Sequence, residues 1–108
     1  MKLVSVVKEL GLKTHCGANL SDEVTGGYVG DLLSDVMAGA TEDQIWITRQ
    51  VHPNIIAVAA VKELAAIVTV AEPEPETVVK AEAEGVALFS TDSSAFEVSG
   101  RLFKLLEP

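Results

Sequence analysis

The apolar positions at the start of the chain repeat with the period of an α-helix. Leu3, Val6, Val7 and Leu10 stand at i, i+3, i+4 and i+7, and the residues between them are mostly polar. Gly11 follows where a helix of this length would end. The same pattern recurs, before Gly39, at Val29, Leu32, Leu33, Val36 and Met37. Two amphipathic helices are therefore predicted in the first forty residues.

Segments typical of β-strands lie between the helical ones. Gln44–Thr48 is rich in β-branched and aromatic residues. Ala66–Val70 is apolar without interruption, which is expected of a strand near the sheet centre that is buried on both faces. Val86–Phe89 is predicted to be the last strand, Leu12–Cys16 could be a short first strand, and another extended segment begins at Val24. Strands and helices therefore alternate along the chain.

Two further helices are predicted between these strands. One begins with Pro53 and Asn54 and runs to about Leu64. The acidic, proline-rich run at 72–76 opens the other, which ends before Gly85, because proline and carboxylates both favour the first turn of a helix. The same run is also compatible with a flexible linker, but a helix start is favoured.

The last predicted helix follows Thr91 or Asp92, either of which can cap it. Its buried stripe is predicted to be Ala95, Val98, Leu102 and Leu106. Gly100 permits a close approach to a neighbouring element. The alternation predicts an α/β fold in one domain over residues 1–108: a mainly parallel sheet of four to five strands with helices on both faces.

Charge and cysteine content narrow the class of protein. Eight basic and sixteen acidic residues give a net charge of -8, the wrong sign for binding nucleic acid or an anionic membrane surface. Cys16 is the single cysteine, so no intrachain disulfide can form, and the chain opens without a secretory signal. A cytoplasmic location is therefore expected, with no nucleic-acid or membrane partner.

Candidate binding residues follow from where strands turn into helices, since ligands of α/β sheets collect beyond the carboxyl ends of strands. The sequence places four such turns at Thr25–Tyr28, Thr48–Gln50, 71–72 and 90–93. The candidate ligand-binding residues are Thr25, Gly26, Gly27, Tyr28, Arg49 and Thr91. The paired glycines suit an anion cradle and equally an ordinary turn, and Arg49 is either an anion partner or half of a surface ion pair.

Enzyme motifs are not found in the sequence. There is neither the Gly-x-x-x-x-Gly-Lys-Ser/Thr loop nor the Gly-x-Gly-x-x-Gly fingerprint. His15, Cys16 and His52 lack the spacing that aims two ligands at one ion. Asp31 and Asp35 could bind a cation or pair as acid and base, but a solvated helix face with a cap explains them more simply. We therefore expect no enzymatic activity, catalytic residue, metal or cofactor.

The helix predicted from Asn54 has an unusual pattern. Residues 55–61 are apolar on every side for two turns, whereas a helix that covers one sheet face should leave a polar stripe in water. A second copy of the chain or a partner protein is therefore expected to cover its outer side. The alternative is that the small alanines at 57, 59 and 60 make that side harmless.

The segment Glu23–Met37, which contains Thr25-Gly26-Gly27, resembles the DRTGG domain family. The resemblance continues more loosely through 47–50, 66–69 and 85–88. It implies a regulatory α/β module that often dimerises and is found beside other domains or free-standing. Glu23 and Val24 stand where the family has Asp and Arg, so a role that depends on that Arg does not carry over.

Two functions are consistent with these observations. The first is a non-catalytic regulatory module, homodimeric through the 55–61 region and the Gly26-Gly27 turn, that acts by contacting a partner protein. The second is a sensor that binds a nucleotide or phosphorylated metabolite at Thr25-Gly26-Gly27, with Arg49 as the charge partner. A hydrolase or metal enzyme is the least favoured alternative.

Overall fold

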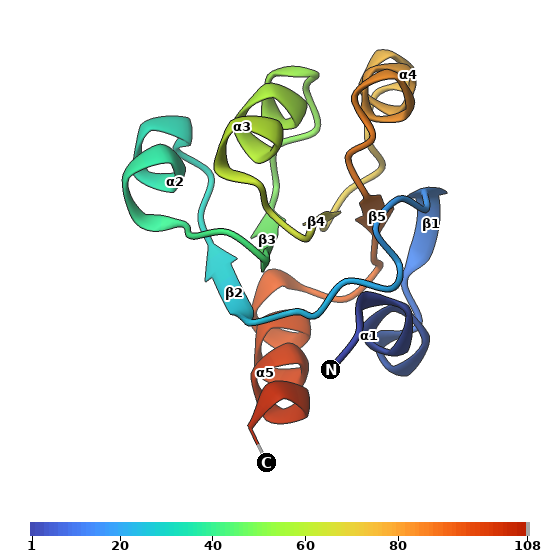
Figure 1. Ribbon diagram of the computed structural model, residues 1–108, viewed down its shortest axis with the longest axis vertical. Helices are drawn as coiled ribbons and strands as arrows, with labels where there is room; N and C mark the ends of the chain where they lie inside the picture. The colour runs from blue at the N-terminus through green and yellow to red at the C-terminus, as the bar shows by residue number, and fades with distance from the viewer. Residues whose placement is uncertain (108) are drawn as a thin grey trace.

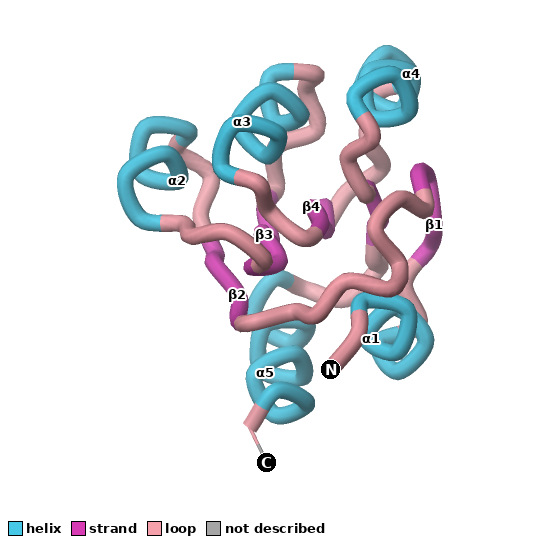
Figure 2. The backbone as a smooth tube through the Cα atoms, in the orientation of Figure 1, coloured by secondary structure: helices cyan, strands magenta, loops and turns pink. Residues whose placement is uncertain are grey.

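The computed structural model describes residues 1–107, in which five strands alternate with five helices (Figures 1 and 2). The helices are α1 (Leu3–Leu10), α2 (Leu33–Gly39), α3 (Asn54–Lys62), α4 (Pro75–Glu84) and α5 (Ala95–Leu106). The strands are β1 (Lys13–Cys16), β2 (Gly26–Val29), β3 (Gln44–Thr48), β4 (Ala66–Thr69) and β5 (Leu88–Ser90). The acidic run after β4 does lead into a helix, which begins at Pro75.

The strands form one sheet in the order β1-β5-β4-β3-β2. The four strands from β2 to β5 are parallel, and β1 pairs antiparallel with β5 at one edge. β4 lies at the centre and all four of its residues are buried, as its uninterrupted apolar sequence predicted. The predicted α/β fold with a mainly parallel sheet is confirmed.

Helices cover both faces of the sheet (Figure 1). α2, α3 and α4 lie on one face, and α1 and α5 lie on the other. Side chains of β3 alternate between two cores: Ile45 and Ile47 pack with α1 and α5, whereas Trp46 packs with α2 and α3. Each face of the sheet therefore has its own hydrophobic cluster.

The predicted ends of two helices are confirmed, and the predicted start of α5 is wrong. Gly11 and Gly85 end α1 and α4 in the left-handed conformation, as predicted. The prediction that Thr91 or Asp92 caps α5 is wrong, because Ser94 holds that place and accepts a hydrogen bond from the Glu97 amide at 3.1 Å. The Thr91 hydroxyl instead accepts from the Ser93 amide, so a turn separates β5 from the helix.

The predicted apolar stripe of α2 is only partly correct. Val36 is fully buried, but Leu32 is 62% exposed and precedes the helix, and Val29 belongs to β2. Helical spacing continued by chance across a strand and a loop, and this made the predicted helix too long. The short helix covers only the edge of the sheet, so one buried side chain is enough to hold it.

α3 lies between α2 and α4, and this position explains its apolar sequence. Its buried residues are Ile55, Ile56, Val58 and Ala59. Neighbouring helices cover its two flanks, and among the apolar residues 55–61 only a narrow outer strip of Ala57, Ala60 and Val61 is exposed to water. The predicted need for a covering partner is therefore weaker than the sequence suggested, because only one of the three exposed side chains is large.

Candidate functional site

The predicted strand-to-helix turn at Gly26 and Gly27 is wrong. Both glycines lie in β2, at the amino end of the strand, and neither has a positive φ. Gly27 packs closely against α5, because a Cβ there would lie 3.0 Å from Cδ2 of Leu102. Gly26 has no such neighbour, since a Cβ there would lie 3.5 Å from the Gln44 side chain, an ordinary contact.

The six predicted binding residues do not form one site. Arg49 and Thr91 follow β3 and β5 and lie beyond the carboxyl ends of the strands, whereas Thr25 precedes β2 at the opposite end. Tyr28 points to the α2 side, where its hydroxyl donates to the Asp35 carbonyl at 3.2 Å. Thr25, Gly26 and Gly27 lie next to one another, but Arg49, the predicted charge partner, lies at the opposite end of the strands.

The loop after β3 is held by a network centred on Asp31. Its Oδ1 accepts from the Thr48 hydroxyl at 3.0 Å and from the Arg49 amide at 2.7 Å. The Gln50 amide donates to the Thr48 hydroxyl at 3.1 Å, and its side-chain amide donates to the Asp31 carbonyl at 3.1 Å. Asp31 lies before α2 and fixes a neighbouring loop, so the prediction that Asp31 and Asp35 share one helix face is wrong.

The Arg49 side chain is exposed and makes no ion pair within residues 1–107. Arg49 was interpreted from the sequence as either an anion partner or half of a surface ion pair. The ion pair is not found in this range. The Asp31 carboxylate occupies the Arg49 amide, however, and its negative charge disfavours an anion at that backbone position.

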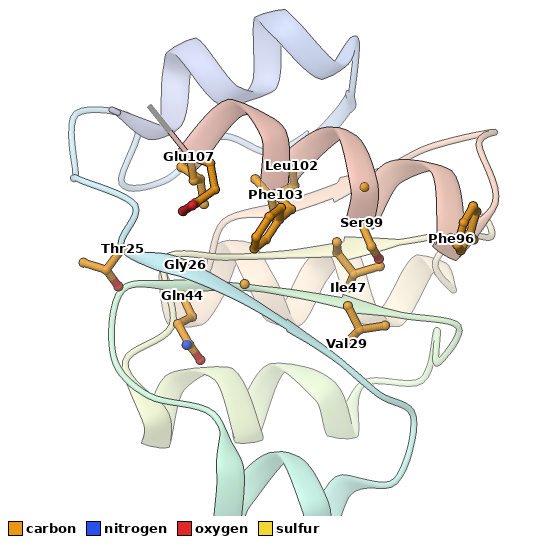
Figure 3. A pocket seen from close by; sticks show the side chains of 13 residues that line it. Thr25, Gly26, Val29, Gln44, Ile47, Phe96, Ser99, Leu102, Phe103 and Glu107 are labelled. Carbon is orange, nitrogen blue, oxygen red and sulfur yellow. The ribbon is translucent and has the colours of Figure 1, made fainter.

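A groove of about 620 Å³ lies between α5 and the strands β2 and β3 (Figure 3). We call it the β2–α5 groove. Its strand side is lined by Thr25, Gly26, Gly27, Val29, Gln44 and Ile47. Its helix side is lined by Phe96, Ser99, Gly100, Leu102, Phe103 and Leu106, with Glu107 at one end. The Thr25-Gly26-Gly27 motif thus opens onto an apolar surface.

Two phenylalanines dominate the rim of this groove. Phe96 is 88% exposed and Phe103 is 69% exposed, although both are large and apolar. They lie outside the buried stripe predicted for α5, whose central members Val98 and Leu102 are indeed buried. Neither residue is among the predicted site residues, although two phenylalanines on the polar side of an amphipathic helix are a signal of an exposed apolar surface.

Gly100, between these phenylalanines, does not make the predicted close approach. A Cβ at this position would meet no atom within 4 Å, so nothing in the chain requires glycine there. No Lys or Arg lines the groove, and Glu107 is its one charged residue. Such a surface suits an apolar occupant better than a phosphate group.

A second polar cluster joins β1, β5 and the loop after β4. The His15 ring Nε2 lies 2.8 Å from the Ser90 hydroxyl and 3.9 Å from Oε1 of Glu72, which also accepts from Lys13 at 2.9 Å. Burial lowers the pKa of His15, against the opposing effect of Glu72, and the Lys13 hydrogen bond lowers the pKa of Glu72. Ser90 and Glu72 approach the same ring nitrogen, so the arrangement is not a catalytic triad.

Residues 1–107 contain no group of three or more histidine, cysteine or acidic side chains placed to hold one metal ion. No helix in that range has the length and the apolar composition that a membrane span requires.

Comparisons with known proteins identify the fold. No family model matches the chain, and no curated protein matches it in sequence. A solved structure of the CBS and DRTGG domains of the regulatory region of Clostridium perfringens pyrophosphatase, in complex with the activator diadenosine tetraphosphate, is similar over 94% of this chain. The TM-score is 0.73 and the identity is 16%, and the match covers 45% of that longer chain. The chain therefore has a DRTGG-like fold.

Proposed function

We propose that the protein is a non-catalytic regulatory module that acts by protein contact through the β2–α5 groove. The observation that carries the proposal is the pair of exposed phenylalanines beside an apolar groove, at the motif that the DRTGG resemblance singled out. Exposed apolar patches of this kind are typical of contact surfaces. The regulatory setting of the structural neighbour supports the same class of function.

Photo-crosslinking inside cells that produce the protein tests this proposal. The photoreactive p-benzoylphenylalanine replaces Phe103, and in the control it replaces Val79 on α4, which is equally exposed at 67%. We expect protein adducts from position 103 and not from position 79. Adducts in equal yield from both positions, or none from position 103, would contradict the proposal.

A second function is a nucleotide sensor. It is supported by the nucleotide activator bound in the structural neighbour and by the unpaired, exposed Arg49. A thermal-shift screen of nucleotides and sugar phosphates tests it, since a ligand at one hundred times its dissociation constant stabilises a fold by about 2.7 kcal/mol. A shift that disappears in Arg49→Ala would favour the sensor, and no shift with any compound would exclude it.

A further inference from the structure

β2 is an edge strand whose outer side has no strand partner (Figure 1). Within the described residues it pairs only with β3. The Gly30 amide donates to the Ile47 carbonyl at 3.2 Å, which continues the β2–β3 ladder past Val29. Because backbone groups alternate in direction along a strand, the N–H and C=O groups of Gly27 and Val29 point away from β3. Both residues are exposed, and no turn or loop backbone of residues 1–107 bonds to them.

The opposite edge of the sheet is protected in a way that β2 is not. β1 carries Lys13, which pairs with Glu72 at 2.9 Å, and its register with β5 shifts between Thr14 and Cys16. Charged side chains and bulges are the usual features that keep an edge strand from pairing with another chain. β2 has no charged side chain, no proline and no register shift over its four residues. It is therefore an open edge that can accept one more strand.

The β2–α5 groove lies beside this open edge (Figure 3). A strand added next to β2 turns every second side chain toward the face of the sheet that α5 covers. On that face stand Phe96 and Phe103, which are 88% and 69% exposed, and Val29, which is 53% exposed. Gly100, between the two phenylalanines, leaves open space, since a Cβ there would meet no atom within 4 Å. The edge can thus hold the main chain of an added strand, and the groove can hold its side chains.

One end of the groove is acidic. Glu107 lies at this end together with Thr25, and no Lys or Arg lines the groove. The Thr25 amide donates to the Asp43 carbonyl at 3.0 Å, and its hydroxyl donates to the Glu42 carbonyl at 3.3 Å. Two further acidic residues therefore lie beside Thr25. A basic residue in the bound segment complements this end.

The basic residues of α5 do not offset this charge. Arg101 donates to the Glu9 carbonyl of α1, and Lys104 lies on the same flank of the helix. A second copy of β2 is a poor match for the edge, because its net charge is also -8 and Asp31 follows the strand closely. The segment that fits therefore belongs to a different protein.

From these observations we propose that the partner binds as an extended segment, which adds to the sheet beside β2. Its alternate apolar side chains enter the β2–α5 groove, and a basic residue lies at the end nearest Glu107. This inference rests on the proposed function and names the chemistry of its partner. Main-chain hydrogen bonds to Gly27 and Val29 provide affinity, and side chains that meet Phe96 and Phe103 provide specificity.

Selection from a phage-displayed library of random peptides of about ten residues identifies the segments that bind the chain. We expect the enriched sequences to carry β-branched or aromatic residues at every second position, a basic residue near one end and no proline between them. Enrichment of apolar residues at helical spacing would overturn the inference in favour of a helical partner. Failure to enrich any sequence would overturn it as well.

Methylation of single backbone nitrogens in an enriched peptide tests the strand pairing itself. The modification removes an N–H donor and keeps the side chain. The dissociation constant should therefore rise at least about fivefold at alternate positions, whose N–H groups face β2, and less than about twofold at the positions between them. Fluorescence anisotropy with the labelled peptides measures these constants. Equal effects at all positions would exclude an added strand.

A substitution in β2 tests the same pairing from the side of the protein. Val29→Pro removes an N–H that points outward and leaves the Gly30 bond to β3 in place, so it should weaken binding of the enriched peptide at least about fivefold. Val29→Thr, the matched control, keeps the N–H and the branched shape and should bind within about twofold of the wild type. Urea unfolding checks that both variants fold, and the methylation series decides if Val29→Pro does not. Wild-type affinity in a folded Val29→Pro variant would refute the pairing.

The two proposals fail in different ways. If position 103 crosslinks to a protein but the methylated peptides show no period of two, the regulatory contact stands and the added strand is excluded. If position 103 crosslinks to nothing, the contact function itself fails.

Discussion

The carboxyl edge of the sheet and the β2–α5 groove differ in how their side chains are used. At the carboxyl edge, Asp31 binds the Thr48 hydroxyl and the Arg49 amide, so the polar groups are satisfied within the chain. In the groove, Phe96 and Phe103 lie exposed on an apolar surface. Ligands of α/β sheets are usually held at the carboxyl edge. Here Asp31 uses part of that edge for stability, whereas large exposed apolar side chains lie on α5 beside β2.

The largest expected effect is the difference in unfolding free energy between a substitution of Leu102, on the floor of the groove, and one of Phe103, on its rim. Leu102 is 3% exposed and packs beside Gly27, so Leu102→Ala should destabilise the fold by about 3 kcal/mol. Phe103→Ala should change stability by no more than about 0.5 kcal/mol, because its ring is mostly in water. Urea unfolding at low protein concentration measures both. An equal loss in the two variants would mean that Phe103 is part of the core.

At the carboxyl edge, Asp31→Ala should destabilise the fold by about 2 kcal/mol, since it removes the acceptor of two hydrogen bonds to a charged group. Asp31→Asn, which keeps an oxygen, should recover part of the loss. Asp35→Ala is the control, because only its backbone carbonyl is hydrogen-bonded by Tyr28. Thermal unfolding of the three variants gives their order of stability. An Asp31→Ala variant as stable as the wild type would show that the carboxyl edge does not depend on the Asp31 hydrogen bonds for stability.

Alanine substitutions at two glycines should change the unfolding free energy in opposite directions. Gly100→Ala should stabilise the monomer by about 1 kcal/mol, because a helical alanine is favoured and its methyl group meets no atom. Gly39→Ala should destabilise by about 1 kcal/mol, since its Cβ would lie 2.9 Å from the Tyr28 ring. Calorimetry at a concentration where the chain is monomeric measures both. Destabilisation by Gly100→Ala would reveal an intramolecular role for that glycine.

The smallest effect concerns acid stability near the His15–Ser90 pair. Because burial lowers the pKa of His15 from 6.5, the unfolded chain takes up its proton first, and stability falls as the pH drops below about 6.5. His15→Gln should flatten this part of the stability profile. Unfolding curves between pH 7.5 and 5 compare this variant with the wild type. An unchanged slope in His15→Gln would rule out His15 as its source.

Local sequence signals predicted most of the fold. β3 has the predicted limits, because β-branched and aromatic residues occupy every position after Gln44, and Gly11 and Gly85 end helices where expected. The parallel sheet followed from the alternation of strands and helices. Errors arose where a pattern had two causes: Val29 continued a helical period by chance, and paired glycines resembled a turn but lie in a strand, where Gly27 packs against Leu102.

The candidate site was less predictable because it depends on tertiary placement. The sequence drew attention to Thr25-Gly26-Gly27, which does line the groove, and to Arg49, which lies elsewhere. No local pattern shows that the chain crosses after β5 and lays α5 against β2. Without that crossing, Phe96 and Phe103 are scattered surface residues, and only the folded sheet brings them to the motif.

Amide chemical-shift mapping is the most direct test of whether the β2–α5 groove is the contact surface. Spectra of the labelled chain are compared before and after addition of a peptide enriched from the library, and then after addition of nucleotides. We predict peptide-dependent shifts at 25–27 and 96–107, and no nucleotide-dependent shifts at 48–50 and 90–93. Shifts that appear only with a nucleotide and only at the carboxyl edge would contradict the contact function and support a sensor.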